Sequence, residues 1–123
     1  MHQEILPLWM DFQNEFLKEY IGKELRILEI GSKLGKSPLL LRDYRIDKNW
    51  EFIGLDVRSG RNVDIVSKDP YKYPFIDNEF DVVVSTSCFE HNEMFWLRFN
   101  EMVRSTKNGG FMNTQKVFSS VVG

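Results

Sequence analysis

The segment from Leu25 to Gly35, LRILEIGSKLG, constrains the fold more than any other part of the sequence. A near-continuous apolar run that closes on a glycine-containing turn is typical of a central parallel strand entering a ligand-binding turn. Glu29 ends the apolar run, and Gly31 and Gly35 allow the backbone to turn sharply and to approach a ligand. Ser37 can then cap the following helix. The segment therefore predicts a nucleotide site.

The overall composition disfavours several classes of partner. The chain has 123 residues, a formal net charge of -2 and one cysteine, Cys88. This charge provides no basic surface field, so a nucleic acid is a disfavoured partner. A single cysteine without a Cys/His ligand spacing predicts neither a disulfide nor a metal site, and we interpret it as a small buried apolar residue. No apolar run approaches the ~20 residues of a membrane span, so we expect a soluble, cytoplasmic domain without a membrane partner.

The hydrophobic periodicity predicts an α/β fold. Helices are expected over residues 3–20, 36–44 and 90–107, and further strands over 50–56, 63–66, 80–85 and from 111 onward. This alternation predicts one domain over residues 1–123 with an open, mainly parallel sheet and flanking helices. Its parts are an N-terminal helix (1–22), a core (25–110) and an incomplete C-terminal strand (111–123). Ligands of such sheets bind beyond the carboxyl ends of the strands.

Two acidic residues extend the predicted nucleotide site. Asp56 ends the second strand 21 residues after Gly35, close to the ~20-residue offset at which a carboxylate reaches ribose hydroxyls. Asp69 lies in a polar loop beyond the next strand, where it can accept a hydrogen bond from the amino group of an adenine. The alternatives are a solvated strand end for Asp56 and a turn-forming role for Asp69.

Five segments in order carry a family resemblance. The series ILEIGSKLG, GLD, DPYKYPF, FDVVVSTSCFEH and EMVRSTKNGG, between Leu25 and Gly110, resembles the class I S-adenosylmethionine-dependent methyltransferases, particularly the type 11 family. The resemblance implies a Rossmann-like fold, and several concordant segments are more specific than a single motif. DPY combined with FEHNEMFWLRFNEM is similar to bacterial and phage members encoded beside glycan genes, which implies a small-molecule or glycan-type acceptor.

The resemblance implies S-adenosylmethionine as the cofactor and S-adenosylhomocysteine as the product. The implied contacts are Glu29, Gly31, Ser32, Gly35 and the backbone of Ser85 and Thr86 for the methionine portion, Asp56 for the ribose, Val57, Asp69 and Pro70 for the adenine, and Phe89 to close the pocket. Within this scheme Glu29 anchors the turn and the methionine amino group.

The chain departs from the family pattern at two places. Lys33 stands where the family has glycine, so its side chain must point away from the cofactor or clamp its carboxylate. The GxGxxG dinucleotide pattern also needs glycine at the positions that Lys33 and Lys36 occupy here. This difference argues against a nicotinamide-dependent enzyme. After Gly110 the family continues through a fifth strand and an antiparallel pair. We expect these antiparallel strands to be lacking here, through truncation or supply by another subunit, and the open sheet edge to favour a homo-oligomer.

His91 is the predicted catalytic residue. Methyl transfer is an in-line displacement at a sulfonium, which requires alignment and exclusion of water rather than a catalytic triad or a metal. A hydroxyl or amine acceptor benefits from a general base, and His91 has a suitable pKa range, with Glu90 placed to orient it. The alternative is that both residues cap the next helix. The sequence therefore predicts methyl transfer or, alternatively, a non-catalytic cofactor-binding remnant or partner subunit.

Overall fold

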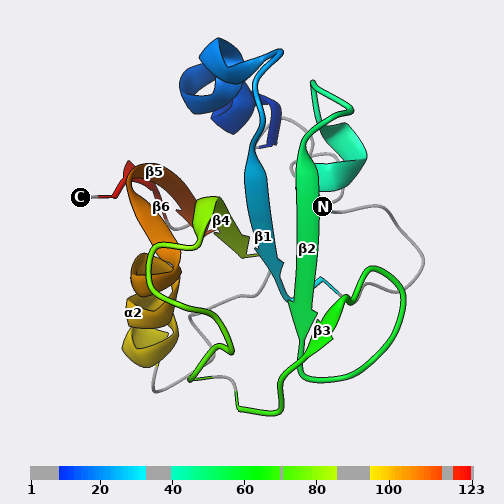
Figure 1. Ribbon diagram of the computed structural model, residues 1–123, viewed down its shortest axis with the longest axis vertical. Helices are drawn as coiled ribbons and strands as arrows, with labels where there is room; N and C mark the ends of the chain where they lie inside the picture. Colours follow the sequence, from blue (N-terminus) through cyan, green and yellow to red (C-terminus); the bar gives the residue numbers. More distant parts are fainter. Residues whose placement is uncertain (1–8, 33–39, 70, 86–94, 115–117, 123) are drawn as a thin grey trace.

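A six-stranded open sheet forms the centre of the molecule. The computed structural model describes residues 9–32, 40–69, 71–85, 95–114 and 118–122. Its strands are β1 (Arg26–Ile30), β2 (Glu51–Asp56), β3 (Ile65–Val66), β4 (Phe80–Ser85), β5 (Thr106–Thr114) and β6 (Phe118–Val121). They lie in the order β3-β2-β1-β4-β5-β6, and all neighbouring pairs are parallel except β5 and β6 (Figure 1). The open, mainly parallel sheet predicted from the sequence is confirmed.

The order of the strands places a switch point between β1 and β4. From β1 the chain proceeds outward through β2 and β3, and then returns to β4 on the other side of β1. The register sets Ile30 of β1 opposite both Leu55 of β2 and Ser85 of β4. The carboxyl ends of these three strands therefore lie side by side, where ligands of doubly wound sheets bind.

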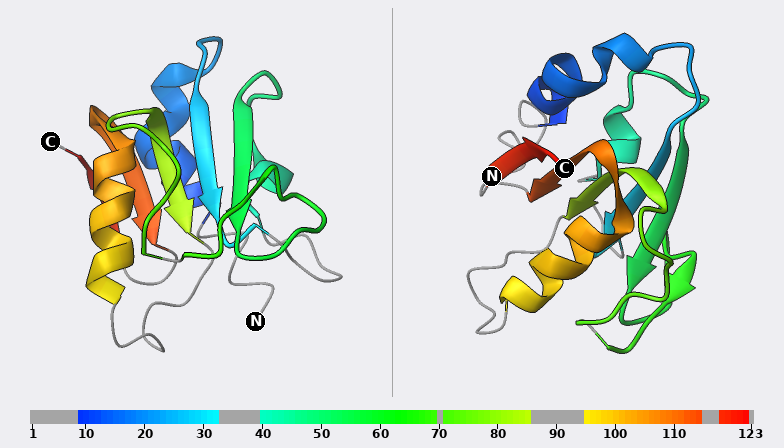
Figure 2. Two further views of the ribbon diagram at one scale, coloured as in Figure 1. Left: turned by 60° about the horizontal axis from the view of Figure 1, so that its bottom comes forward. Right: turned by 60° about the vertical axis from the view of Figure 1, so that its left-hand side comes forward.

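Helical segments cover both faces of the sheet. The segment over 9–20 and the short 3-10 helix η3 (Leu41–Tyr44) lie on one face, and α2 (Phe95–Ser105) lies on the other (Figure 2). Because side chains alternate along a strand, Ile27 of β1 packs under the first group while Leu28 packs with Met102 of α2. Burial on both faces explains why the apolar run of β1 is continuous.

The N-terminal helical segment buries the apolar face that the sequence predicts, and its helix type changes along its length. Residues 9–12 are α-helical, and the π-helix η1 (Gln13–Leu17) and the 3-10 helix η2 (Lys18–Tyr20) follow. Trp9 and Phe12 are buried, and Gly22, at a φ of +86°, follows the end of the segment. Residues 3–8 of the predicted helix lie outside the described part. Gln13 fixes the segment, because its Nε2 donates to the Tyr44 carbonyl at 2.9 Å.

Two predicted helices are shorter in the structure. Within the predicted helix over 36–44 only η3 is helical among the described residues, and Leu40 before it is extended (φ -91°, ψ 150°). The helix predicted over 90–107 is described from Phe95 and already ends at Ser105. The Thr106 hydroxyl donates to the Met102 carbonyl at 2.6 Å, and β5 starts at Thr106. Among the described residues, no helix has the length and apolarity needed to cross a membrane.

The C-terminal part differs most from the prediction. β5 begins at Thr106 rather than at Phe111, because Asn108-Gly109-Gly110 forms an irregularity within the strand and not a loop before it. The register shifts there, from Phe80 opposite Thr106 to Val82 opposite Phe111. Gly109 adopts a φ of +81°, and a side chain at Gly110 would come within 2.5 Å of the Asp81 carbonyl oxygen. Glycine allows both the bend and the close approach.

The expectation that antiparallel strands are lacking is also wrong for one strand. β6 pairs antiparallel with β5, with Phe111 opposite Val121 and Thr114 opposite Phe118. Two further hydrogen bonds extend this pairing, from Gly109 N to Val122 O (2.6 Å) and from Val122 N to Gly110 O (2.8 Å). An antiparallel neighbour needs only a short connection. The segment 111–123, predicted as one incomplete strand, therefore contributes residues to both β5 and β6.

Candidate functional site

The glycine turn after β1 crosses the end of β2. Gly31 has a φ of +76°, a conformation that glycine adopts without steric cost. Its N–H donates to the carbonyl of Leu55 at 2.8 Å, and the N–H of Ser32 donates to the same carbonyl at 3.3 Å. The turn is therefore held against the strand end that carries Asp56.

Asp56 and Val57 extend this edge. The Asp56 carboxylate accepts from the Val57 N–H at 2.7 Å, and its carbonyl accepts from Ser67 N at 2.9 Å. Val57 is 42% exposed, and Val66, opposite Asp56 on β3, is 46% exposed. An exposed apolar surface beside a half-buried carboxylate is a suitable place for a nucleoside, since the base needs apolar contact and the ribose needs acceptors.

Asp69 lies beyond β3 and is exposed. Its Oδ1 accepts from Tyr71 N at 2.9 Å, so the carboxylate stabilises the turn of its own loop. Arg104 of α2 holds the loop further along, donating to the carbonyls of Tyr73 (3.1 Å) and Phe75 (2.7 Å). Asp69 thus has the turn-forming role that the sequence offered as the alternative to an adenine contact.

Glu29 is fully buried and paired with Arg42 of η3. The Arg42 backbone N–H donates to Oε2 of Glu29 at 3.1 Å, and Arg42 Nε donates to Oε1. Burial raises the pKa of the Glu29 carboxyl above its ordinary value, while the contacts from Arg42 act in the opposite direction. The pairing attaches η3 to the strand that leads into the glycine turn.

Gly54 allows the turn and the strand to approach closely. It lies opposite Glu29, its N–H donates to Asp64 Oδ2 at 2.7 Å, and its carbonyl accepts from Asp64 N at 2.9 Å. A methyl group at Gly54 would overlap the carbonyl oxygen of Asn62 and would lie 2.5 Å from Ser32 Oγ. The 62–64 segment and Ser32 therefore both pack directly on this position.

The structure brings together part of the predicted site. Gly31, Ser32, Asp56, Val57 and Ser85 share the carboxyl edge of β1, β2 and β4, with Glu29 one residue inside it. Predicted residues that lie outside the described part are Gly35, Pro70, Thr86, Phe89 and His91, together with Lys33, Ser37 and Cys88. In the described ranges, no cluster of three or more His, Cys, Asp or Glu residues is arranged to hold a metal.

Arg42 and Gly54 were missed by sequence reasoning. Arg42 lies in a leucine-rich segment and meets Glu29 only through the fold. Gly54 interrupts the apolar pattern of its strand, and an isolated glycine within a strand is a recognised signal of close backbone approach. That signal was available in the sequence.

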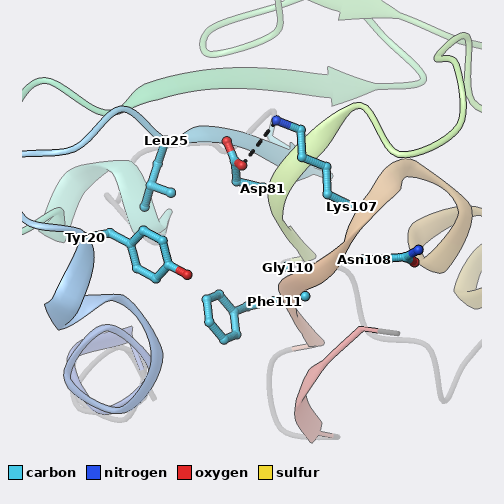
Figure 3. Close-up of a pocket in the computed structure, with 8 residues that line it drawn as sticks. Tyr20, Leu25, Asp81, Lys107, Asn108, Gly110 and Phe111 are labelled. Carbon is cyan, nitrogen blue, oxygen red and sulfur yellow. Dashed lines mark ion pairs between the residues drawn. The ribbon is translucent and has the colours of Figure 1, made fainter.

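A small hollow lies at the opposite, amino-terminal end of the sheet (Figure 3). It has a volume of about 150 Å³, and its lining includes Tyr20, Leu25, Asp81, Lys107 and Phe111. Lys107 Nζ lies 3.3 Å from Asp81 Oδ1, and Asp81 Oδ2 also accepts from a backbone N–H. These charges balance each other, and the hollow is separated from the carboxyl edge by the length of the strands.

The fold and the site define a class. A doubly wound sheet with a glycine turn after its first strand, a carboxylate after its second and a switch point between them belongs to the nucleotide-binding α/β folds. Comparison with protein families makes this specific: a model described as a methyltransferase domain matches residues 28–113. Because this match covers more than half of the chain, the chain belongs to the methyltransferase-domain family.

Solved structures agree with this fold. A protein of Methanococcus maripaludis to which S-adenosylmethionine-dependent methyltransferase activity is ascribed superposes with a TM-score of 0.64 at 22% identity, over 91% of this chain and 56% of that one. The mycinamycin-pathway methyltransferase MycE, solved with Mg and S-adenosylhomocysteine, gives 0.63 at 19% identity over 90% and 35%. The [4+2]-cyclase SpnF gives 0.62 at 19% over 89% and 43%.

The chain spans just over half the length of the first of these proteins and less of the other two. At these identities the likeness concerns the fold. The search among curated proteins finds no match.

Proposed function

We propose that the chain binds S-adenosylmethionine at the carboxyl edge of β1, β2 and β4 and supports methyl transfer. The observation that carries the proposal is the register, which aligns Ile30, Leu55 and Ser85 at the switch point of a methyltransferase-family fold. This alignment places Gly31 and Asp56, the next residue on each of two strands, at one edge. The bound S-adenosylhomocysteine of MycE, which shares this fold, supports the choice of nucleotide.

The residues present fit such a cofactor. Asp56 would accept the ribose hydroxyls, and Val57 would pack on the adenine with its exposed side chain. Gly31 would bring the main chain close to the amino-acid portion. When bound, S-adenosylmethionine supplies an activated methyl group on a sulfonium, and the chain contributes alignment and exclusion of water. His91, outside the described residues, is our proposed general base for a hydroxyl or amine acceptor.

The acceptor in this proposal is a small molecule or a glycan. The second candidate function is cofactor binding without turnover, as a remnant or a partner subunit. In both candidates Glu29 keeps its bonds to Arg42, which donates to each of its two oxygens, so the methionine amino group would share Glu29 as an acceptor with Arg42. Among the strands of the described residues, β6 lies at the edge of the sheet beside β5, and we propose its outer edge as the site of homo-oligomer formation.

Calorimetry with matched variants of β2 tests cofactor binding. Asp56 ends the strand and Glu51, also a carboxylate, begins it. We expect Asp56→Asn to weaken S-adenosylmethionine binding about tenfold or more, because it removes an ionised acceptor, and Glu51→Gln to leave binding unchanged. Equal effects of the two variants, or no binding of S-adenosylmethionine and S-adenosylhomocysteine by the native chain, would refute the proposed site.

Turnover is tested separately. Methyl release is measured on a panel of sugars, small acids and amines, with the mass of the protein in solution recorded in parallel. Binding together with methyl release supports the enzyme, and binding without release on the whole panel supports the second candidate.

A further inference from the structure

A group of polar residues converges on the sheet face around Gly54. Glu29 lies opposite Gly54 in register, so their Cβ positions point to the same face of the parallel pair. Arg42 reaches this face from η3 and binds both oxygens of Glu29. Ser32, which follows the glycine turn, has its Oγ 2.5 Å from the position that a Cβ of Gly54 would take. Glu29 and Ser32 thus both adjoin Gly54, and Arg42 is bound to Glu29, so the three residues form one group beside the carboxyl edge.

Two hydrogen-bond donors in this group have no acceptor. Ser32 is fully buried, and its Oγ has no hydrogen-bond partner. The Nη2 atom of Arg42 is also buried without a partner, although Nε of the same guanidinium is bound to Glu29. Buried donors without acceptors are rare in proteins, and a charged one is particularly unfavourable. Two such donors beside a predicted ligand site indicate that the ligand provides the acceptor.

The charge balance defines the chemistry of that acceptor. Arg42 and Glu29 neutralise each other, so a lone anion placed here would leave an excess of negative charge near a buried carboxylate. A zwitterion avoids this excess, because its carboxylate can accept from Arg42 and Ser32 while its ammonium donates to a remaining lone pair of Glu29. The amino-acid portion of the proposed cofactor is such a zwitterion.

We propose that Arg42, together with Ser32, binds the carboxylate of the amino-acid portion of S-adenosylmethionine and makes the site selective for a carboxylate-bearing nucleoside. This inference rests on the proposed function, because it assigns contacts within the same cofactor site. It adds a residue of η3 to a site otherwise built from strand ends and turns.

The test compares S-adenosylmethionine with its decarboxylated form, which keeps the adenosine, the sulfonium and the amine. The native chain is expected to bind S-adenosylmethionine about ten- to a hundredfold more tightly, the range of a charge-assisted hydrogen bond. Arg42→Lys keeps a positive charge for Glu29 but removes the second guanidinium nitrogen. We expect it to weaken binding of S-adenosylmethionine about tenfold and to leave binding of the decarboxylated form unchanged.

Two control variants are available in the chain. Arg45 is exposed and lies over the same Phe52 ring as Arg42, with guanidinium-to-centroid distances of 5.6 Å and 6.0 Å. Arg45→Lys is therefore expected to change neither affinity. Ser32→Ala tests the second donor without disturbing the charge of the pair. Its control is Ser105→Ala, since Ser105 is also buried with an unpartnered hydroxyl but lies at the end of α2.

The outcomes separate the two proposals. If Arg42→Lys and Ser32→Ala weaken both ligands equally or neither, the carboxylate contact is wrong while the cofactor site stands. If the native chain binds neither ligand, both proposals are overturned. Should Arg42→Lys fail to fold, Ser32→Ala decides alone, and loss of the preference for the carboxylate supports the inference.

Discussion

Replacing Gly54 with alanine tests how closely the turn and the strand are packed. The added methyl group would overlap the carbonyl oxygen of Asn62, would lie 3.0 Å from the carbonyl carbon of the same residue and 2.5 Å from Ser32 Oγ. Overpacking of a well-packed position costs about 1–3 kcal/mol and occasionally more. The main obstacle here is backbone, which cannot rotate away as a side chain can. We therefore expect a loss of about 3 kcal/mol, a large part of the roughly 5–15 kcal/mol of a typical domain.

Urea unfolding measures this loss. With an m-value of about 1–3 kcal/mol/M, the midpoint of Gly54→Ala should fall by about 1–3 M. Gly22→Ala is the matched control, because Gly22 has a positive φ of +86° but no atom within 4 Å of the added Cβ. It should lose only about 1–2 kcal/mol from backbone strain. The double variant Ser32→Ala/Gly54→Ala should not recover stability, because the contact with Asn62 remains. A midpoint for Gly54→Ala at or above that of Gly22→Ala would refute this account.

Two further predictions concern the loop and the nucleoside surface. Hydrogen bonds from Arg104 lower the pKa of Glu101 below its ordinary value, so this carboxylate contributes stability above that value and loses it as the pH falls through the lowered pKa. Glu101→Gln should therefore be less stable than the native chain near neutral pH, and urea unfolding across a pH series should show this difference shrinking toward low pH; a constant difference would contradict the assignment. Val57→Ser should weaken S-adenosylmethionine binding several-fold in calorimetry through lost apolar contact, whereas Ile76→Ser, at an apolar residue 73% exposed, should leave it unchanged.

The strands were predictable because their sequence signals are local. The β-branched run over 80–85 coincides with β4, and the expected strand over 50–56 differs from β2 by one residue. Burial on both faces requires continuous apolar runs, and such runs are visible without knowledge of the neighbours. The C-terminal part was predicted less well. Asn108-Gly109-Gly110 has the same composition whether it forms a loop or a bulge, and only pairing with β4 on one side and β6 on the other decides between them.

The candidate site shows the same division. Gly31 and Asp56 were found from spacing, because the backbone conformation and the strand end are local properties. Arg42 was not found, since a salt bridge between residues 13 positions apart forms only when η3 folds back onto β1. The two donors without acceptors are likewise a property of the packed structure, because a side chain in an unfolded chain is hydrogen-bonded to water.

The sequence by itself determined the parallel sheet, its central strand and the glycine turn that leads into the proposed cofactor site, since apolar runs and glycines act through local backbone preferences. The tertiary structure decided which residues meet at that turn. It placed Gly54 beneath Ser32, closed Arg42 on Glu29 and added β6 as an antiparallel edge, because each of these contacts joins segments whose separation in the sequence carries no signal of their proximity.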